Sequence, residues 1–537
     1  MTRDATPAVA YLAAASLGLL CALWMFPAEF VWPAAGLPWR IAGDTAQHIT
    51  AQRWFLSEPW SWRPLLIRTL GEPDGVMLPF ADGIPLIALP LKALAAWLPP
   101  GFHGIGLWHF FSWVLQPLAA VWCLRGAGER RLLPAIGIAA LALGMPAWLS
   151  RYGHAALSGH FLILLGLGFY LRLVRAPTRA LWVGAVALQA VSLLAHPYLA
   201  VMTLALLGAV PLTLLLRGDA RWRGATVGAA AAVAAMLLPM AGLGYFGAGG
   251  GAGFGDYALN LLSPVWPHGS WLLGGLAPGF VDATGLGGWE GYNWLGLGTM
   301  LAILASVVLA PHAAAAMPRR HAGLLLALLG LTAIALSFRI GLGERILLDL
   351  GPAPALMEQF RASGRFFWPV GYAVAIGAAV LLCRATRAGP ALLLMLGLLQ
   401  LADAQPLRAE LRAWAHAHAA WQLEAPALRA LLATHRRLTL LPSWHCAPAA
   451  MRSAAQERLL ELLLLASERP LPVNTMYVAR WTNAPRCADE TLAAAPLVPG
   501  ELRLILPESR ARDLPLVPDG ATLCRYIGAI AACSLAR

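Results

Sequence analysis

An aspartate and a histidine stand four residues apart directly after the first hydrophobic segment, in the stretch Gly43-Asp44-Thr45-Ala46-Gln47-His48. If this stretch is helical, the spacing places Asp44 and His48 on one face. An aspartate there can act as a general base, and a histidine one turn later can hold a metal ion with it or orient it. Two plainer interpretations stay open. In the first, Asp44 only caps a helix that begins at Thr45. In the second, His48 is an ordinary histidine at a membrane interface.

Two arginines with the same spacing precede a late hydrophobic segment. Arg361 and Arg365 would also point to one side of a helix. Guanidinium groups placed in this way can form a bidentate clamp on a phosphate, and Glu358 is a candidate to orient one of them. The alternative is that the arginines only anchor the segment at the membrane surface.

Other side chains with binding potential recur between hydrophobic segments. His154 ends the sequence Ser-Arg-Tyr-Gly-His, while His196 and Tyr198 belong to Ala-His-Pro-Tyr. Glu290 and Tyr292 lie in a stretch rich in glycine and tryptophan, where aromatic rings can stack on a sugar. We predict substrate binding by all five. Ionisable groups beside membrane spans are often functional, but helix packing is the alternative for the two histidines.

The composition indicates the elements that must position these residues. Hydrophobic residues make up 59% of the 537 residues, charged residues 12%, and the mean hydropathy is +0.64. These values are typical of a polytopic α-helical membrane protein. The net charge of +12 comes from arginines in short clusters between apolar runs, where they orient helices, so we expect no nucleic-acid partner. Membrane spans are predicted at residues 11–26, 105–124, 133–149, 155–171, 181–194, 199–216, 225–245, 295–309, 323–336, 367–383 and 391–401.

Arginine clusters between alternate pairs of spans predict the topology. They are Arg125, Arg130 and Arg131; Arg172, Arg175 and Arg179; Arg217, Arg221 and Arg223; Arg319 and Arg320; Arg384 and Arg387. All of them can be cytoplasmic together, with the C-terminus outside. Eleven crossings result if the apolar residues 84–98 are re-entrant, and thirteen if they cross and one span has been missed. Both counts leave every candidate site residue on the outer side. The first segment lacks a strongly basic start and a small-residue cleavage site, so we expect a first helix and not a cleaved signal.

A polar region follows the last span. Residues 1–404 are expected to form the membrane domain, with an outer first loop at 27–83, and residues 405–537 a small C-terminal α/β domain. Its pattern predicts helices at 420–434 and 451–467 and strands at 438–442, 474–478 and 501–506. The domain also contains Cys446, Cys487, Cys524 and Cys533. An even number in an oxidising compartment favours two disulfides, and zinc binding is the alternative.

This layout resembles the GT-C superfamily of membrane glycosyltransferases, which use sugars linked to polyprenyl phosphate. The superfamily includes oligosaccharyltransferases, protein O-mannosyltransferases and aminoarabinose transferases. The segments GDTAQHITAQRWFLSEPW, SRYGHAALSGHF, AHPYL, GYNWLGLG and RASGRFFWP are more similar still to an uncharacterised bacterial membrane protein family of that type. The resemblance covers most of residues 1–404 in layout and short motifs in detail. It departs at Asp44, because the adjacent acidic pair of several members is replaced here by Gly43 and Thr45.

The resemblance implies that Asp44 is the catalytic acid of the first loop, and it implies a multi-pass protein of the bacterial inner membrane with a periplasmic C-terminal domain. The expected reaction moves a sugar from a polyprenyl-phosphate carrier to a periplasmic or cell-envelope acceptor, either a glycan or a lipid. A divalent cation held by Asp44 and His48 is the candidate cofactor. The alternative is a non-catalytic protein, either a transporter or flippase for lipid or polysaccharide or an assembly scaffold. A transporter is expected to show internal repeats and charges in mid-span, and the sequence shows no convincing repeat.

Overall fold

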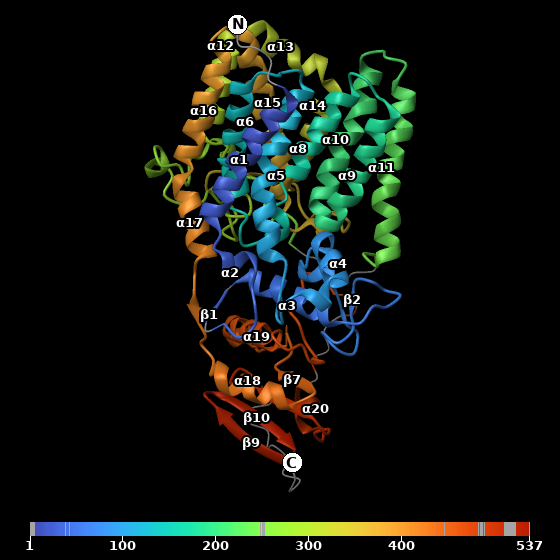
Figure 1. The fold of residues 1–537 in the computed structure, drawn as a ribbon, viewed down its shortest axis with the longest axis vertical. Coiled ribbons are helices and arrows are strands. Elements are labelled where there is room, and N and C mark those ends of the chain that lie inside the picture. Colours follow the sequence, from blue (N-terminus) through green and yellow to red (C-terminus); the bar gives the residue numbers. More distant parts are fainter. Residues whose placement is uncertain are drawn as a thin grey trace.

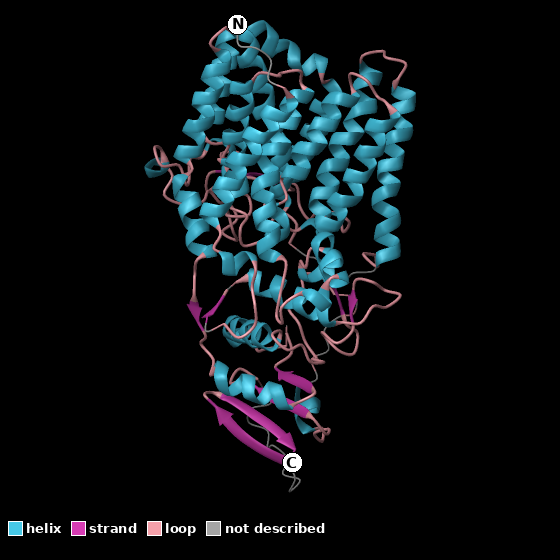
Figure 2. Ribbon diagram, viewed as in Figure 1, coloured by secondary structure: helices cyan, strands magenta, loops and turns pink. Residues whose placement is uncertain are grey.

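The computed structural model describes residues 6–37, 39–41, 43–246, 249, 253–444, 446–481, 483, 487, 489–509 and 522–535. Long helices form a tall bundle, and a smaller part containing strands extends from one end of it (Figures 1 and 2). The predicted class, a helical polytopic membrane protein with a small C-terminal region of helices and strands, is confirmed.

Within the described residues, six helices are long and apolar enough to cross a membrane. They are α1 (Pro7–Met25), α5 (Ile105–Gly126), α8 (Phe161–Leu173) with the turn before it, α10 (Pro197–Leu216), α11 (Trp222–Leu243) and α15 (Trp368–Ala385) with the turn before it. The number rises to eight if each of two bent pairs is one span: α12 (Leu297–Leu309) with α13 (Pro311–Arg320), and α16 (Gly389–Asp403) with α17 (Gln405–Ala415). Three shorter apolar helices are α6 (Leu132–Leu143), α9 (Arg179–Ala195) and α14 (Ala322–Leu336). Every apolar run expected to span coincides with one of these helices.

The apolar residues 84–98 do not form a span. They fold into α4 (Pro85–Ala93), which has nine residues, and a single 3-10 turn (Ala95–Trp97). A helix needs about 20 residues to cross a bilayer, so α4 is too short. It packs instead against α3 (Asp44–Ser57) and α9.

Small side chains let α1 approach α5 closely. Ala10, Ala14, Gly18 and Ala22 are buried at a spacing of four residues along α1. A Cβ atom on Gly18 would lie only 2.7 Å from the carbonyl oxygen of Trp113 in α5. Small residues at this spacing are the usual means of close helix packing in membranes.

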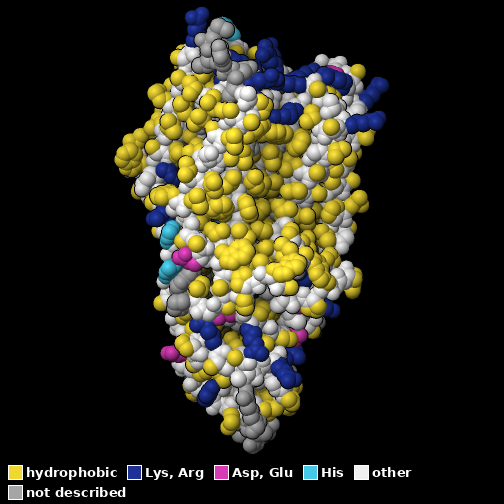
Figure 3. All heavy atoms as spheres, in the orientation of Figure 1, with side chains coloured by type: hydrophobic (Ala, Val, Ile, Leu, Met, Phe, Trp, Pro, Cys, Tyr) yellow, Lys and Arg dark blue, Asp and Glu magenta, His cyan; other side chains and the backbone are white. Residues whose placement is uncertain are grey.

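The arginine clusters gather at the end of the bundle opposite the strand-containing part, where Figure 3 shows the main concentration of basic side chains. Arg175 and Arg384 both donate to the carbonyl oxygen of Ala127, at 2.6 and 2.8 Å. Arg217 donates to the carbonyl oxygen of Arg320. Loops from distant parts of the sequence therefore meet at one basic end, as the predicted topology requires.

The first loop lies at the other end, between the bundle and the C-terminal region (Figure 1). It contains α2 (Ala28–Val31), α3, and a small hairpin of β2 (Leu66–Ile67) and β3 (Val76–Met77). Strand β1 (Trp39–Arg40) pairs with β6 (Ala419–Ala420), so the loop is joined directly to the C-terminal region. The backbone N–H groups of Gly71 and Glu72 also donate to the carbonyl oxygen of Val473, both at 2.9 Å.

The C-terminal region contains a four-stranded sheet in the order β7-β8-β10-β9. Strands β7 (Arg437–Leu441) and β8 (Glu501–Ile505) are parallel, whereas β10 (Ile530–Leu535) runs antiparallel to β8 and to β9 (Thr522–Ile527). Its helices are α18 (Ala425–Thr434), α19 (Arg452–Ala466) and α20 (Asp489–Ala494). The predicted helices and the strands at 438–442 and 501–506 are present within a few residues.

The strand predicted at 474–478 is wrong. The side chain of Asn474 takes the place of backbone pairing: its Oδ1 accepts from the N–H of Leu440 at 2.8 Å, and its Nδ2 donates to the Leu440 carbonyl oxygen at 3.0 Å. An asparagine side chain can compete with ladder hydrogen bonds in this way. The chain therefore leaves the sheet after Val473 and runs toward the membrane domain.

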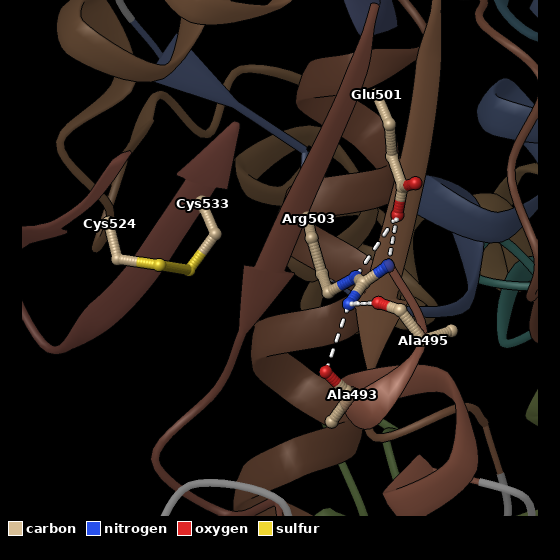
Figure 4. Close-up of a disulfide and its surroundings, with 6 residues drawn as sticks. All are labelled: Ala493, Ala495, Glu501, Arg503, Cys524 and Cys533. Carbon is tan, nitrogen blue, oxygen red and sulfur yellow. Dashed lines mark hydrogen bonds and ion pairs between the residues drawn. A yellow bond between two sulfur atoms is a disulfide. The ribbon is translucent and has the colours of Figure 1, made fainter. Parts of the chain in front are cut away.

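Two disulfides join the four C-terminal cysteines. Cys446 is bonded to Cys487 and Cys524 to Cys533, which leaves no thiolate of this set for zinc. Figure 4 shows the second disulfide beside a buried ion pair, in which Arg503 contacts Glu501 and the carbonyl oxygens of Ala493 and Ala495.

The two disulfides are expected to stabilise the fold unequally, because they close loops of 41 and 9 residues. Loop-closure entropy gives about 4 kcal/mol for the long loop and about 2.5 kcal/mol for the short one. Thermal unfolding of the purified protein should therefore shift further for Cys446→Ser with Cys487→Ser than for Cys524→Ser with Cys533→Ser. Equal shifts would contradict this account.

Candidate functional site

Asp44 is the first residue of α3, and its carboxylate does not cap the helix. The cap position is taken by Gly43, whose φ of 74° suits glycine, and no side chain makes the capping hydrogen bond. The capping interpretation is therefore wrong. The side chain is 44% exposed, and its Oδ2 lies 3.4 Å from Nε2 of His154. An accessible carboxylate beside an imidazole is suited to accept a proton.

His48 lies one turn further along α3 and is completely buried. Neither of its ring nitrogens has a hydrogen-bond partner in the described part of the chain. Its Nε2 is 3.8 Å from Oδ2 of Asp82, and its ring centroid is 6.1 Å from that of His154. A buried imidazole without partners is unfavourable, and both ring nitrogens of His48 are available to a ligand.

Asp82 faces His48 from a tight turn. It follows a 3-10 turn (Leu78–Ala81) with a φ of 51°, a conformation that aspartate tolerates better than most residues. Its Oδ1 lies 3.4 Å from Nε2 of His196. Nδ1 of His196 accepts from the N–H of Tyr198 at 3.1 Å, so Nε2 carries the proton and donates to Asp82.

Burial and these contacts shift the pKa values of the group. Burial raises the pKa of Asp82, but the hydrogen bond from His196 and the charges of the nearby histidines lower it further, so that the pKa falls well below its usual range. Burial lowers the pKa of His48 to about 4. Near neutral pH the pair is a carboxylate and a neutral imidazole, which are the forms that bind metal ions.

His48, Asp82 and His154 can together hold a divalent cation. One ligand atom of each lies within 4.8 Å of the others. Two imidazoles with a carboxylate are typical of Zn²⁺ or Mn²⁺ sites, and are less suited to Ca²⁺. The residues fit a metal ion, although Asp44 approaches them only through His154.

Glu290 lies at the centre of a buried ion-pair network next to this group. Its Oε2 accepts from Arg151 at 2.6 Å, Arg365 makes two contacts at 2.7 and 2.9 Å, and His154 Nε2 lies 3.2 Å from Oε1. Burial raises the pKa of Glu290, but Arg365 and Arg151 more than offset this and hold it well below its usual range. Glu290 is thus occupied by protein partners, and it helps to hold His154 beside Asp44.

Arg361 and Arg365 do not form the predicted pair. They do not share one helix, since two separate 3-10 turns (Met357–Phe360 and Ser363–Phe367) shape this segment. Arg365 is buried against Glu290, whereas Arg361 is exposed and donates to the hydroxyl of Tyr257 at 2.9 Å. Arg361 alone of the two remains accessible to an anion.

The remaining predicted residues have structural partners. The hydroxyl of Tyr198 accepts from the N–H of Ala362 at 3.0 Å, and its ring stacks on Phe366. Tyr292 is buried, and its hydroxyl donates to the carbonyl oxygen of His268 at 2.6 Å, so it does not face the metal-binding group. Glu358 accepts from the N–H of Phe254 at 3.1 Å and does not pair with Arg361.

The model of the family described as "Domain of unknown function (DUF6311)" matches residues 15–405, and that of the "DUF6311 C-terminal domain" matches residues 427–535. The chain belongs to this family. No curated protein matches it. Among solved structures it is similar to an oligosaccharyltransferase from Archaeoglobus fulgidus tethered with an acceptor peptide containing the NVT sequon. The identity is 13%, the TM-score is 0.41, and the match covers 87% of this chain and 64% of the other.

The structure brings two further residues of the DUF6311 membrane region to the candidate site, Asp82 and Arg151, which the sequence analysis does not single out. Asp82 was only one of several acids in the first loop, since no spacing rule joins it to His48. Arg151 belongs to the same short motif as His154. The sequence analysis uses arginines to predict which loops are cytoplasmic, and this says nothing about the acidic residue that each arginine contacts. The signal that the sequence offers is the position of both residues in outer loops. Many other residues share that position, and the sequence gives no way to choose among them.

Divalent-cation binding should depend on the buried group. Asp82→Asn, which keeps the turn because asparagine also tolerates positive φ, and His48→Ala should each weaken Mn²⁺ binding about tenfold or more. Titration calorimetry on the purified protein measures this, with Glu344→Gln, an exposed carboxylate elsewhere, as the matched control. Unchanged affinity in both variants would exclude this group as the metal site.

Proposed function

We propose that this protein is a membrane glycosyltransferase, which moves a sugar from a polyprenyl-phosphate carrier to an acceptor of the cell envelope. The observation that carries the proposal is the accessible carboxylate of Asp44, held 3.4 Å from His154 at the edge of a buried group suited to a metal ion. This site lies where the helix bundle meets the C-terminal domain, so a lipid carrier in the membrane and a polar acceptor outside it can both approach (Figure 1).

In the proposed reaction, the acceptor oxygen bonds to the anomeric carbon while the bond from that carbon to the phosphate oxygen breaks. Asp44 accepts the acceptor's proton, and the electron pair of the broken bond stays on the departing polyprenyl phosphate. His154 positions Asp44, and Arg361 offers positive charge to the phosphate. A divalent cation held by His48, Asp82 and His154 would add positive charge for the leaving group. Direct displacement of this kind inverts the anomeric centre.

The proposed location is the bacterial inner membrane, with the C-terminal domain in the periplasm. Two observations support it: the basic loops lie at the opposite end of the bundle, and the C-terminal cysteines form disulfides. Nucleotide sugars are cytosolic, so a site on the outer side needs a donor carried by a lipid.

The test is donor consumption by the purified protein in lipid nanodiscs. A panel of polyprenyl-phosphate hexoses and pentoses is supplied, and release of polyprenyl phosphate is followed, with water as the slow acceptor. At least one donor should be consumed faster than in empty nanodiscs. If no member of the panel is either bound or consumed, the proposed function fails.

A further inference from the structure

A segment of the C-terminal domain, residues 477–481, reaches into the site; we name it the site strap. The carbonyl oxygen of Tyr477 accepts from Nε2 of Gln47 at 2.9 Å, and the N–H of Ala479 donates to the carbonyl oxygen of Phe80 at 2.8 Å. Gln47 directly precedes His48, and Phe80 is two residues before Asp82. The strap is therefore bonded to the two elements that carry His48 and Asp82, two of the three residues of the metal-binding group.

The third attachment of the strap is made by Arg480. Its guanidinium donates to the carbonyl oxygen of Gln359 at 3.0 Å and to that of Ala479 at 2.7 Å. Gln359 lies two residues before Arg361, so the strap places a second arginine beside the segment that carries the first. Carbonyl contacts use only part of the five N–H donors of a guanidinium, and the others remain for a ligand.

Among the described residues, Arg361 and Arg480 have no acidic partner. No carboxylate in the described part of the chain lies within ion-pair distance of either side chain, whereas Arg151 and Arg365 both pair with Glu290. Burial lowers the pKa of the half-buried Arg480, and the positive charge of Arg361 lowers it further, although Tyr198 and Asp82 act in the opposite direction. Two guanidinium groups that act on each other without an acid between them are stabilised by a shared anion.

Contacts within the C-terminal domain also fix the position of the strap. The ring of Tyr477 stacks on Trp444, with centroids 4.4 Å apart and planes at 26°. The Cys446–Cys487 disulfide ties the segment after Trp444 to the segment after the strap. Arg480 is thus presented on a fixed backbone, which lowers the entropy lost when it binds a ligand.

We propose that Arg361 of the membrane domain and Arg480 of the C-terminal domain together bind the phosphate group of the substrate, so that the anion site is complete only when the two domains are joined. The inference rests on the proposed function for the identity of the substrate, a polyprenyl phosphate ester. The two guanidinium groups would bind a pair of phosphate oxygens. A lipid phosphate and a free phosphate both present such oxygens.

The experiment measures ligand binding to the full-length protein in nanodiscs. The probes are farnesyl phosphate, farnesol and inorganic pyrophosphate. Arg361→Gln and Arg480→Gln should each weaken farnesyl phosphate binding about tenfold or more while farnesol binding is unchanged. Arg480→Lys should recover little, because a point charge does not reproduce the fork. The double variant should lose less than the product of the single losses, because both arginines hold the same phosphate.

The matched control is Arg525→Gln, which removes the same charge from the exposed face of β9 in the same domain. It should bind every probe as the natural chain does. If Arg361→Gln weakens farnesyl phosphate binding but Arg480→Gln does not, the contribution of the strap is refuted and the proposed function survives. If the natural chain binds farnesyl phosphate no better than farnesol, yet binds pyrophosphate through both arginines, the anion site survives and the lipid donor is refuted. If neither variant affects any probe, the inference is overturned.

Discussion

Asp44→Asn should abolish sugar transfer, lowering its rate on the order of a thousandfold. An amide has nearly the shape of the carboxylate but cannot accept the acceptor's proton. The helix should be unaffected, because Gly43 occupies the cap position and the Asp44 side chain makes no capping hydrogen bond. The measurement is the initial rate of polyprenyl phosphate release at saturating donor.

Two controls separate chemistry from binding and folding in the Asp44→Asn variant. Farnesyl phosphate affinity and the midpoint of thermal unfolding should match those of the natural chain. His154→Gln should reduce the rate less than Asp44→Asn, because it removes the neighbour that positions the base and one of three proposed cation ligands, but leaves the base itself. Transfer within a few-fold of the natural rate in Asp44→Asn would remove this residue from the mechanism.

Glu290→Gln should destabilise the membrane domain by about 3–5 kcal/mol, because it leaves two buried arginines without a counter-charge. Glu290 is 5% exposed and contacts Arg151 at 2.6 Å and Arg365 at 2.7 Å. The measurement is the midpoint of thermal unfolding in detergent. Asp349→Asn is the matched control: its pair with Arg339 spans 3.5 Å at the exposed hairpin of β4 (Arg339–Leu342) and β5 (Arg345–Asp349), and should contribute less than about 1 kcal/mol.

The same network predicts a pH dependence with a definite sign. The pKa of Glu290 is lower in the folded protein than its usual value of 4.5, so folding favours the charged form. The stabilisation is complete above that usual value and is lost as the pH falls toward the folded pKa. Glu290→Gln should lack this part of the acid dependence. An equal loss of stability on acidification in both proteins would show that the ion pairs contribute little.

The membrane helices could be predicted from the sequence because hydropathy averages over many residues. Each apolar run was long enough to outweigh local exceptions such as Pro117 inside α5 or Pro211 inside α10. For residues 84–98 the sequence leaves two possibilities open, re-entrant or crossing, since prolines and Lys92 interrupt the apolar run, and the structure shows that the run forms only the short α4. Hydropathy carries no information about which loops meet, so it does not show which candidate residues lie close together in space.

The placement of the candidate residues could be predicted in part, and the differences have physical causes. Asp44, His48 and His154 do converge, because α3 carries two of them and the turn after α7 (Pro146–Leu149) carries the third. Arg365 was assigned to a ligand because a spacing of four was interpreted as helical, whereas consecutive 3-10 turns direct it to Glu290. Asp82 depends on a positive φ, and Arg480 lies two residues after the segment 474–478, which the sequence predicts as a strand and the structure does not form. Backbone exceptions of this kind are invisible to periodicity.

The site strap has a consequence for the nascent chain. Translation runs from the N-terminus, so Asp44, His48 and Asp82 leave the ribosome long before Arg480. During that interval the polypeptide has the proposed general base but only one of the two arginines proposed to bind the phosphate. Under the proposed function, a partly synthesised chain would therefore bind a lipid-linked sugar poorly and would transfer little of it to water. Docking of the C-terminal domain would then be the step of biosynthesis that completes the proposed phosphate site, so that only finished molecules would consume the proposed carrier.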